Sequence, residues 1–380
     1  MFEVHESEGA FPALEEYLEE TGFWEAEDLV ADLYLGYGLA QAIRRDPAPA
    51  PPEPCPLPLL ACRIGPCPES RTPDLSGSAA SAVPPPPGPS SLPVLARRSE
   101  PCPASRTRDL SGFAVGDWTP SWSPRAYAGA IEQVRAAIAR GDVYQVNLVQ
   151  HLEAPFEGDP AALAAALAPL RPLQPRPFAG DGWTIVSASP ELFLARRGRR
   201  VWTMPIKGTR PLDGESLADA DKDRAEHVMI VDLERNDLSR VCEPGSVVWP
   251  ELMVERELAG VVHLVSTVEG MLRDDIGLAE LLEATFPGGS VTGAPKIAAV
   301  DHIAALEPVG RGASMGALGR LWPNGDLELA LTIRTFAVAE DRVHLWVGGG
   351  IVWDSEPDAE IEESWVKARP LLDALKVAVA

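Results

Sequence analysis

Apolar and polar positions follow a helical period shortly after residue 122. Between residues 127 and 138 the large apolar side chains recur every three or four positions, as they do on one face of a helix. Ser123 and Pro124 stand where an N-cap and a first-turn proline belong, and Gly141 stands where a helix-ending glycine belongs. The pattern therefore predicts a helix from residue 124 to residue 140.

Further along the chain, short apolar runs bounded by turn residues predict strands, and longer periodic runs predict helices. Because the strands come in runs rather than in strict alternation with helices, the sequence predicts an α+β fold rather than a doubly wound α/β fold. Strands are expected at 143–152, 183–188, 191–195, 200–206, 247–254, 261–268 and 343–352, with a hairpin across 321–331. Helices are expected after Asp159 and at 218–237, 277–286, 294–306 and 359–377.

Composition divides the chain into three parts. Residues 1–46 carry enough apolar side chains to pack. Residues 47–121 are rich in Pro, Ser, Ala and Gly, and segment 66–77 recurs almost unchanged as 101–112. Such a tract cannot bury enough apolar surface to offset its ordering entropy, so it is interpreted as a disordered insertion, with a partner-docking segment as the alternative. Residues 122–380 form the main domain.

Charge and cysteine content narrow the partners and the compartment. The chain has 380 residues, is 46% hydrophobic and carries a formal net charge of -23. Such a surface repels phosphate backbones and anionic lipids, so neither nucleic acid nor membrane partners are expected. No apolar run is long enough to span a bilayer, and the acidic N-terminus lacks the pattern of a signal peptide. Five cysteines without a CxxC pair are interpreted as reduced, which predicts a cytoplasmic protein.

Lys207 is the first candidate for chemistry. It lies in the segment MPIKGTRP (204–211), at the end of an expected strand. A lysine at such a strand end loses solvent, and desolvation lowers the pKa of its amine and makes it a nucleophile. The alternative for an isolated lysine is an edge-strand side chain that reaches back to water.

Carboxylates on two of the expected helices are candidates for a cation site. Glu360, Glu363 and Lys367 share one face of the last helix, where the alternative is a solvated charged face. Glu226 is one of several acidic residues inside the apolar helix 218–237. Buried carboxylates need a cation, and Mg²⁺ is the usual partner of oxygen ligands. Whether Glu226 meets Glu363 depends on the fold.

Two glycine-rich segments are candidates for ligand contacts. The segment FPGGSVTGAPK (286–296) leads into an expected helix, whose first backbone N–H groups can bind an anion. Residues 348–350 are three glycines in an expected strand, where a backbone without side chains lets a ligand approach closely. Neither a P-loop nor a Rossmann fingerprint is present, so the sequence gives no support for nucleotide binding.

Together these segments resemble the chorismate-utilising enzyme family, which includes anthranilate synthase component I, aminodeoxychorismate synthase component I, isochorismate synthase and salicylate synthase. The resemblance covers roughly two thirds of the chain, from about residue 122 onward, in the family's order. It implies a two-sheet β-sandwich flanked by helices, with 1–46 as a reduced N-terminal segment of that fold. The segments that carry it are GDVYQVNL (141–148), SPELF (189–193), PIKGT (205–209), AEHVMIVDL (225–233), PGGSVTGAPK (287–296), IRT (333–335) and GGGIV (348–352).

Two positions indicate which member the chain resembles. Family members that add water at C2 of chorismate carry a lysine where this chain has Gln145, which argues against isochorismate or salicylate formation. Anthranilate synthases carry alanine where this chain has Lys207, so the resemblance is closest to aminodeoxychorismate synthase component I. It implies that Lys207 attacks C2 and expels the C4 hydroxyl, and that ammonia then enters at C4 and expels the lysine. A spectator lysine beside the substrate is the alternative.

The resemblance also implies roles for other residues. Glu191 would donate a proton to the departing hydroxyl, and His263 would lie near the same hydroxyl, unless it is simply a core histidine. The implied metal ligands are Glu226 and Glu363, with Glu360 close by, holding Mg²⁺ against the substrate's ring carboxylate. The implied substrate-binding residues are Thr292, Gly293, Arg334, Gly348, Gly349, Gly350 and Lys367.

The resemblance finally implies a partner and a product. A glutamine amidotransferase subunit would supply the ammonia, because the chain shows no segment of that type. The lyase that releases 4-aminobenzoate is also absent, so the expected product is 4-amino-4-deoxychorismate, whether it serves folate synthesis or a specialised pathway. Two alternatives remain: anthranilate synthase component I, which aminates C2, and a catalytically silent chorismate-binding subunit.

Overall fold

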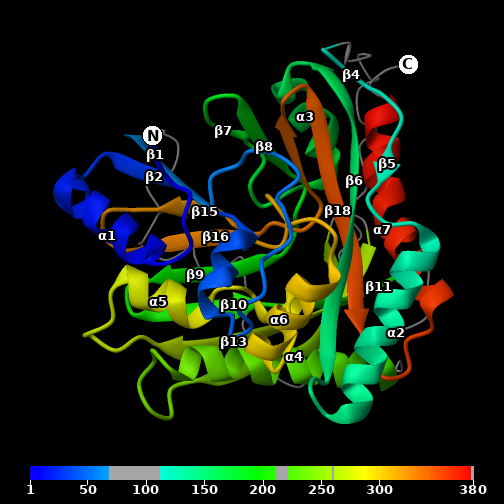
Figure 1. The fold of residues 1–380 in the computed structure, drawn as a ribbon. Helices are drawn as coiled ribbons and strands as arrows, with labels where there is room; N and C mark the ends of the chain where they lie inside the picture. Colours follow the sequence, from blue (N-terminus) through cyan, green and yellow to red (C-terminus); the bar gives the residue numbers. More distant parts are fainter. Residues whose placement is uncertain (68–111, 211–220, 259–260, 378–380) are drawn as a thin grey trace, which may run out of the picture.

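The computed structural model describes residues 1–67, 112–210, 221–258 and 261–377. Within these residues, two antiparallel sheets pack together, with helices around them (Figure 1). The predicted α+β, two-sheet architecture is confirmed.

The larger sheet carries Lys207 at one edge and the N-terminal strands at the other. Ten of the described strands belong to it. Their order is β1 (Phe2–Val4), β3 (Leu60–Pro66), β2 (Leu29–Leu35), β15 (Ala317–Leu321), β16 (Leu327–Leu331), β9 (Leu192–Arg197), β10 (Arg200–Met204), β13 (Val261–Met271) and β11 (Ile206–Arg210), with β12 (Val248–Leu258) also paired to β13.

The second sheet carries the three consecutive glycines. Its long central strands pair in continuous register, so that residues 348–350 of one lie beside residues 147–149 of the other. The order is β14 (Gly293–Ala294), β6 (Gln145–Gly158), β18 (Arg342–Ile351), β17 (Thr335–Ala339), β8 (Trp183–Ser187) and β7 (Phe178–Ala179), with β4 (Phe113–Val115) and β5 (Thr119–Pro120) also paired to β6.

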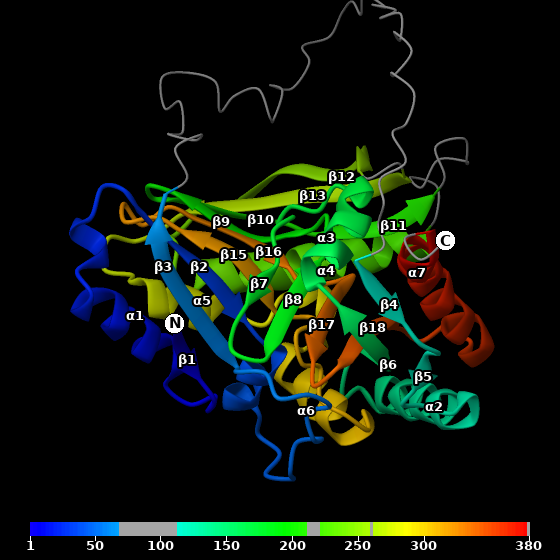
Figure 2. The ribbon, with the colours of Figure 1, turned by 90° about the horizontal axis from the view of Figure 1, so that it is seen from above.

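The helices cover both sheets, and α2 (Pro124–Arg140) has the ends that its sequence predicts. Ser123 Oγ accepts a hydrogen bond from the amide of Ala126 at 3.2 Å, and Gly141 closes the helix with φ 81°. Figure 2 shows α2 and α7 on the outer side of β6 and β18. The remaining helices are α1 (Ala10–Glu20), α3 (Pro160–Leu167), α4 (Asp221–Ser239), α5 (Leu278–Thr285), α6 (Lys296–Leu306) and α7 (Pro357–Val377).

The range 47–121 contains more order than its composition suggests. Strand β3 lies inside it and pairs with β1 and β2, while β4 and β5 pair with β6. Leu60 and Cys62 of β3 are fully buried. The sequence did not predict this short apolar strand, because prolines surround it. The duplicated segments lie almost wholly outside the described residues, and their interpretation as an insertion stays a prediction.

A buried ion pair holds together segments that form the candidate site. Arg311 is 1% exposed and donates to Glu307 at 2.7 and 2.9 Å. It also donates to the carbonyls of Val291, at 2.8 Å, and Asn147, at 2.7 Å. Glu307 in turn accepts from the amide of Val149 at 3.0 Å. One side-chain pair therefore fixes the glycine-rich segment against β6.

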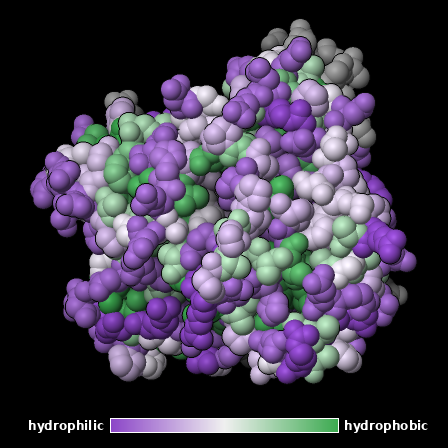
Figure 3. Space-filling view, viewed as in Figure 1, coloured by the Kyte–Doolittle hydropathy of each residue, from purple (hydrophilic) through white to green (hydrophobic). Residues whose placement is uncertain are grey.

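The face of the molecule in Figure 3 is largely hydrophilic, and its hydrophobic residues are exposed in small separate areas. In the part of the chain that the structure describes, no helix is both long and apolar enough to cross a bilayer. The four cysteines of that part are free thiols.

Replacing Arg311 by Leu should lower the free energy of unfolding by about 3–5 kcal/mol, because it leaves the Glu307 carboxylate buried without its counter-charge. Urea unfolding followed by circular dichroism measures the loss. Arg369→Leu is the matched control: Arg369 is 54% exposed and pairs with Glu362 at 2.7 Å, so its loss should cost at most about 1 kcal/mol. Equal losses in the two variants would contradict the role given to Arg311.

Candidate active site

Lys207 reaches the interior because the backbone bends around it. Pro205 separates β10 from β11, and the pairing of β11 with β13 shifts its register after Lys207. Gly208, the next residue, has φ 64°, a left-handed conformation that glycine adopts without strain. The resulting bulge leaves the Lys207 side chain 14% exposed, facing α4.

Lys207 forms an ion pair with Glu226 of α4. Its Nζ lies 2.7 Å from Glu226 Oε1 and donates a second hydrogen bond to the carbonyl of Ser290 at 3.3 Å. Glu226 Oε1 also accepts from Nε2 of Gln145, on β6, at 2.8 Å. Both sheets and α4 therefore meet at one carboxylate oxygen.

The ion pair raises the pKa of Lys207. Burial lowers this pKa, but the negative charges of Glu226, Glu191 and Glu363 outweigh the effect of burial. For Glu226 the two effects have the opposite signs: burial raises its pKa, and the charges of Lys207 and Lys367 lower the pKa below its ordinary value. The expectation that desolvation lowers the pKa of Lys207 is therefore wrong for this arrangement, because the Glu226 carboxylate lies 2.7 Å from the amine. The sequence alone did not reveal this carboxylate.

Glu191 precedes β9 and is 4% exposed. Its Oε1 accepts a hydrogen bond from the hydroxyl of Ser290 at 2.8 Å and from the amide of Ile206 at 3.4 Å. Burial raises the pKa of Glu191, and the Ser290 hydrogen bond and the charge of Lys207 only partly oppose it. A carboxyl whose pKa is raised by burial suits a general acid.

His263 lies on β13 beside the bulge and is 2% exposed. Its Nδ1 lies 2.8 Å from the carbonyl of Gly208. Burial lowers the pKa of His263, and the Gly208 contact opposes this shift. The structure thus brings the ring next to the Lys207 turn, while its role toward a substrate stays a prediction.

Gly350 lets the end of β18 approach the Lys207–Glu226 pair. A Cβ atom at Gly350 would lie 1.9 Å from Gln145 Nε2 and 2.6 Å from Glu226 Oε1, so a side chain here would displace both groups. Two side chains of the protein thus occupy this space, and the expected approach of a ligand to residues 348–350 stays a prediction.

Gly349 faces the acidic end of α7. A Cβ atom there would lie 3.3 Å from Lys367 Nζ, 3.4 Å from Glu363 Oε1 and 3.7 Å from Glu360 Oε2. Lys367 pairs with Glu363 at 2.7 Å and donates to the carbonyl of Gly348 at 2.9 Å. Consecutive strand residues face opposite sides of a sheet, so the groups of α7 and α4 approach this end of β18 from two sides. The charge of Lys367 nevertheless lowers the pKa of Glu226, and that of Glu363 raises the pKa of Lys207.

The donor set at this end of β18 fits Mg²⁺ in its chemistry. Glu226, Glu360 and Glu363 supply hard oxygen ligands. Gln145 Oε1, buried beside Glu226, has no hydrogen-bond partner among the described residues. Lys207 pairs with Glu226, and Lys367 pairs with Glu363. The carboxylate oxygens of Glu226, Glu360 and Glu363 are also too far apart to form a compact group of metal ligands. Holding an ion would therefore require these side chains to rearrange.

Arg334 lies between β16 and β17 in an uncommon conformation. Its φ of 51° belongs to the left-handed region that residues other than glycine rarely adopt. Burial lowers the pKa of Arg334, and the charge of Glu191 opposes this shift. The charge of Glu191 therefore acts on this guanidinium, and its role as a carboxylate anchor stays a prediction.

Thr292 and Gly293 fasten the glycine-rich segment to β6. The buried hydroxyl of Thr292 donates to the carbonyl of Gly288 at 2.8 Å. A Cβ atom at Gly293 would lie 2.2 Å from the carbonyl of Gln145, so only glycine fits this approach. Hydrogen bonds from either residue to a substrate stay predictions.

Two residues of the cluster received no catalytic or binding role from the sequence. Ser290 bonds to both Glu191 and Lys207, and Gln145 bonds to Glu226. Both belong to motifs that carried the family resemblance, so the signal was present. Their partners lie far away along the chain, and only the fold shows them.

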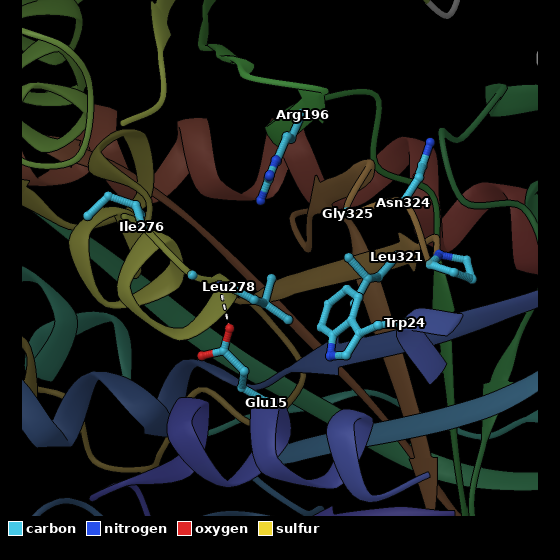
Figure 4. A pocket seen from close by; sticks show the side chains of 10 residues that line it. Glu15, Trp24, Arg196, Ile276, Leu278, Leu321, Asn324 and Gly325 are labelled. Atoms are coloured by element: carbon cyan, nitrogen blue, oxygen red, sulfur yellow. Dashed lines mark hydrogen bonds between the residues drawn. The ribbon is translucent and has the colours of Figure 1, made fainter. Parts of the chain in front are cut away.

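A surface pocket of about 270 Å³ lies elsewhere, between α1, α5 and the β15–β16 turn (Figure 4). Arg196 and Trp24 line it, and Glu15 stands at its edge. Glu15 accepts hydrogen bonds from the amides of Leu278 and Ala279, at 2.8 and 3.3 Å, and so satisfies the start of α5. None of the predicted site residues lines this pocket, so it is separate from the lysine–carboxylate cluster.

Residues 85–373 match the model of the chorismate binding enzyme family. The chain therefore belongs to this family, and the resemblance seen in its motifs is confirmed.

Relatives with two different activities are equally similar. Aminodeoxychorismate synthase component 1 of Klebsiella aerogenes is 41% identical over 272 residues, 68% of this chain and 60% of that protein. Anthranilate synthase component 1 of Thermus thermophilus is 42% identical over 272 residues, 68% of this chain and 58% of that protein. The matched part thus spans little more than half of these curated relatives.

Solved structures agree on the fold. Anthranilate synthase component I from Streptococcus pneumoniae superposes with a TM-score of 0.71 and 28% identity, over 90% of this chain and 80% of that chain. A putative 2,3-dihydroxybenzoate-specific isochorismate synthase from Bacillus anthracis gives a TM-score of 0.69 at 22% identity, over 99% of this chain and 91% of that chain. The second likeness concerns the fold alone.

Proposed function

We propose that this chain is the synthase component of an aminodeoxychorismate synthase, which converts chorismate and ammonia to 4-amino-4-deoxychorismate. The observation that carries the proposal is the buried amine of Lys207, 2.7 Å from Glu226 and joined through Ser290 to Glu191. The similarity to relatives of either activity, at 41% and 42% identity, favours neither. Lys207 does favour one, because the alanine of anthranilate synthases cannot form a bond to the substrate.

The proposed reaction proceeds by two displacements. Lys207 Nζ forms a bond to C2 while both conjugated ring double bonds shift by one position and the C4–O bond breaks. Glu191 gives its proton to the departing hydroxyl, which leaves as water. Ammonia then attacks C4, both double bonds shift back, and the bond between C2 and Nζ breaks. Ammonia has replaced the hydroxyl, and the lysine is regenerated.

Lys207 must lose a proton before it attacks. Glu226 Oε1, 2.7 Å from Nζ, is the nearest described base. The negative charge of this carboxylate is also what raises the amine pKa against the effect of burial. Any positive charge that binds Glu226 therefore weakens the pair and leaves desolvation to lower the pKa.

Binding of the substrate is proposed to use the cations and the glycines around the cluster. Arg334 and Lys367 would bind carboxylate oxygens, with backbone amides of 348–350 and contacts from Thr292 and Gly293. When bound, Mg²⁺ would supply positive charge to the ring carboxylate. The residues that would hold it are Glu226, Glu360 and Glu363.

The ammonia source is proposed to be a glutamine amidotransferase subunit. Burial raises the pKa of Cys242 to about 11 and that of Cys62 to about 12, whereas a cysteine nucleophile needs a lowered pKa. Cys62 and Cys242 therefore do not suit glutamine hydrolysis. Free thiols also suit a cytoplasmic location.

Lys207→Ala should reduce 4-amino-4-deoxychorismate formation from chorismate, Mg²⁺ and ammonium by roughly 10³-fold or more, because the covalent route is lost. The product is identified by mass and by conversion to 4-aminobenzoate with the lyase. The smaller residue opens C2 to ammonia, so traces of anthranilate are expected from the variant.

Arg235→Ala, which removes an exposed cation of α4, is the control and should leave turnover within about twofold. Anthranilate as the main product of the unmodified protein would overturn the assignment, and no turnover at all would favour a silent subunit. Unchanged C4 amination by Lys207→Ala would refute the covalent route while leaving the activity in place.

Glu363→Gln should raise the Mg²⁺ concentration needed for half-maximal activity by roughly tenfold or more, because it removes a charged ligand. Glu362→Gln changes the neighbouring residue of α7, which is 59% exposed and pairs with Arg369, and should leave the requirement unchanged. Mg²⁺-induced change in tryptophan fluorescence gives a second readout. The same Mg²⁺ dependence in both variants would contradict the proposed metal site.

A further inference from the structure

A second cluster of ligand-type side chains lies on β6 and β18, away from the lysine and the glutamates. His151 and Glu153 share one face of β6, and His344 of β18 stands opposite Glu153 in the register. Six residues of extended strand separate His151 from Gln145. The cluster is therefore about 20 Å along β6 from the Lys207–Glu226 pair.

The spacing of the three ligand atoms approaches that of a metal coordination sphere. His151 Nε2 lies 3.0 Å from His344 Nδ1, and His344 Nδ1 lies 3.9 Å from Glu153 Oε2. All three atoms lie within 4.8 Å of one another, and in the part of the chain that the structure describes no other group of three does so. A tetrahedral ion with ligands at about 2.0–2.1 Å holds them about 3.3 Å apart, so small shifts in distance are needed. The two rings, 17° from coplanar, must also turn until both lone pairs face the ion.

Neighbouring groups orient each ligand. Ser121 Oγ lies 2.6 Å from His151 Nδ1, and when this nitrogen donates its proton to the hydroxyl, Nε2 presents a lone pair to the cluster. Arg342 holds both oxygens of Glu153, Oε1 at 2.8 Å and Oε2 at 3.3 Å, and Oε2 is the oxygen on the side of His344, where an ion would share it with the guanidinium. Metal-binding histidines and carboxylates are commonly held by such outer hydrogen bonds.

Burial and charge favour a transition metal over Mg²⁺. His151 is 3% exposed and His344 is 1% exposed. Burial disfavours the charged form of both rings, and the neutral imidazole is the form that binds a metal. Two imidazoles and one carboxylate suit Zn²⁺, whereas Mg²⁺ prefers oxygen alone. Glu153, with its side chain 32% exposed, gives an ion access from solvent.

We propose that His151, His344 and Glu153 bind one Zn²⁺ ion, or a similar nitrogen-seeking divalent transition metal, with water as the fourth ligand. The ion replaces the proton of the imidazole–imidazole hydrogen bond, which moves to the other nitrogen of His344 or to solvent. It ties β6 to β18 and, through Ser121, to the segment that leads into α2. The site is independent of the amination chemistry and of its Mg²⁺.

The test is equilibrium dialysis of chelator-treated, tag-free full chain against micromolar Zn²⁺ in excess Mg²⁺, followed by elemental analysis. We expect one Zn²⁺ per chain and a rise in melting temperature. Co²⁺ in place of Zn²⁺ should give the visible absorption of a four-coordinate site with nitrogen and oxygen ligands. No stoichiometric binding by the folded protein would overturn the proposal and leave the two histidines as a simple hydrogen-bonded pair.

His344→Gln and Glu153→Gln should each weaken Zn²⁺ binding by roughly tenfold or more while keeping a polar group of similar size in place. His302→Gln removes a histidine of α6 outside the cluster and is the matched control. Circular dichroism and melting without metal verify that each variant folds. Equal binding by His344→Gln and His302→Gln would assign the ion to another place and contradict the proposed site.

Discussion

The ion pair between Lys207 and Glu226 is the interaction on which the candidate site depends. It brings together a strand of the large sheet and helix α4, and through Gln145 it reaches the second sheet. Two opposing effects act on the amine: burial favours its neutral form, and the carboxylates favour its charged form. In this structure the effect of the carboxylates is larger, so the pKa of Lys207 is raised. The proposed chemistry therefore requires the charge of Glu226 to be taken up when substrate arrives.

The scaffold supplies this pair at specific positions of the backbone. The bulge at Gly208 turns Lys207 inward, and Gly350 lets β18 approach without displacing Glu226. The buried Arg311–Glu307 pair holds the glycine-rich segment that carries Ser290 against β6. A side chain does not fit at Gly350, because its Cβ atom would lie 1.9 Å from Gln145 Nε2, and Gly208 has the left-handed φ that favours glycine. Both the glycines within the motifs and the packing between distant segments therefore fix the positions of Lys207 Nζ and Glu226 Oε1.

Much of the fold was predictable from the sequence because its signals are local. The caps of α2, at Ser123 and Gly141, and the apolar runs of the main strands lie within single segments, and the structure contains them. Strand β3 was missed because a short apolar run stood among prolines. The raised pKa of Lys207 was missed for a different reason: it depends on a carboxylate from another segment, which no local pattern reveals. The same holds for Ser290, whose two partners lie in distant parts of the chain.

The central claim is that the Lys207 amine bonds to the substrate, and intact-mass measurement tests it most directly. The protein is mixed with chorismate and Mg²⁺ without ammonia, quenched in acid, weighed and mapped by peptide. The account predicts an added mass of one chorismate less one water, located on the peptide that contains Lys207. An unmodified chain, from protein that aminates C4 as soon as ammonium is added, would contradict it.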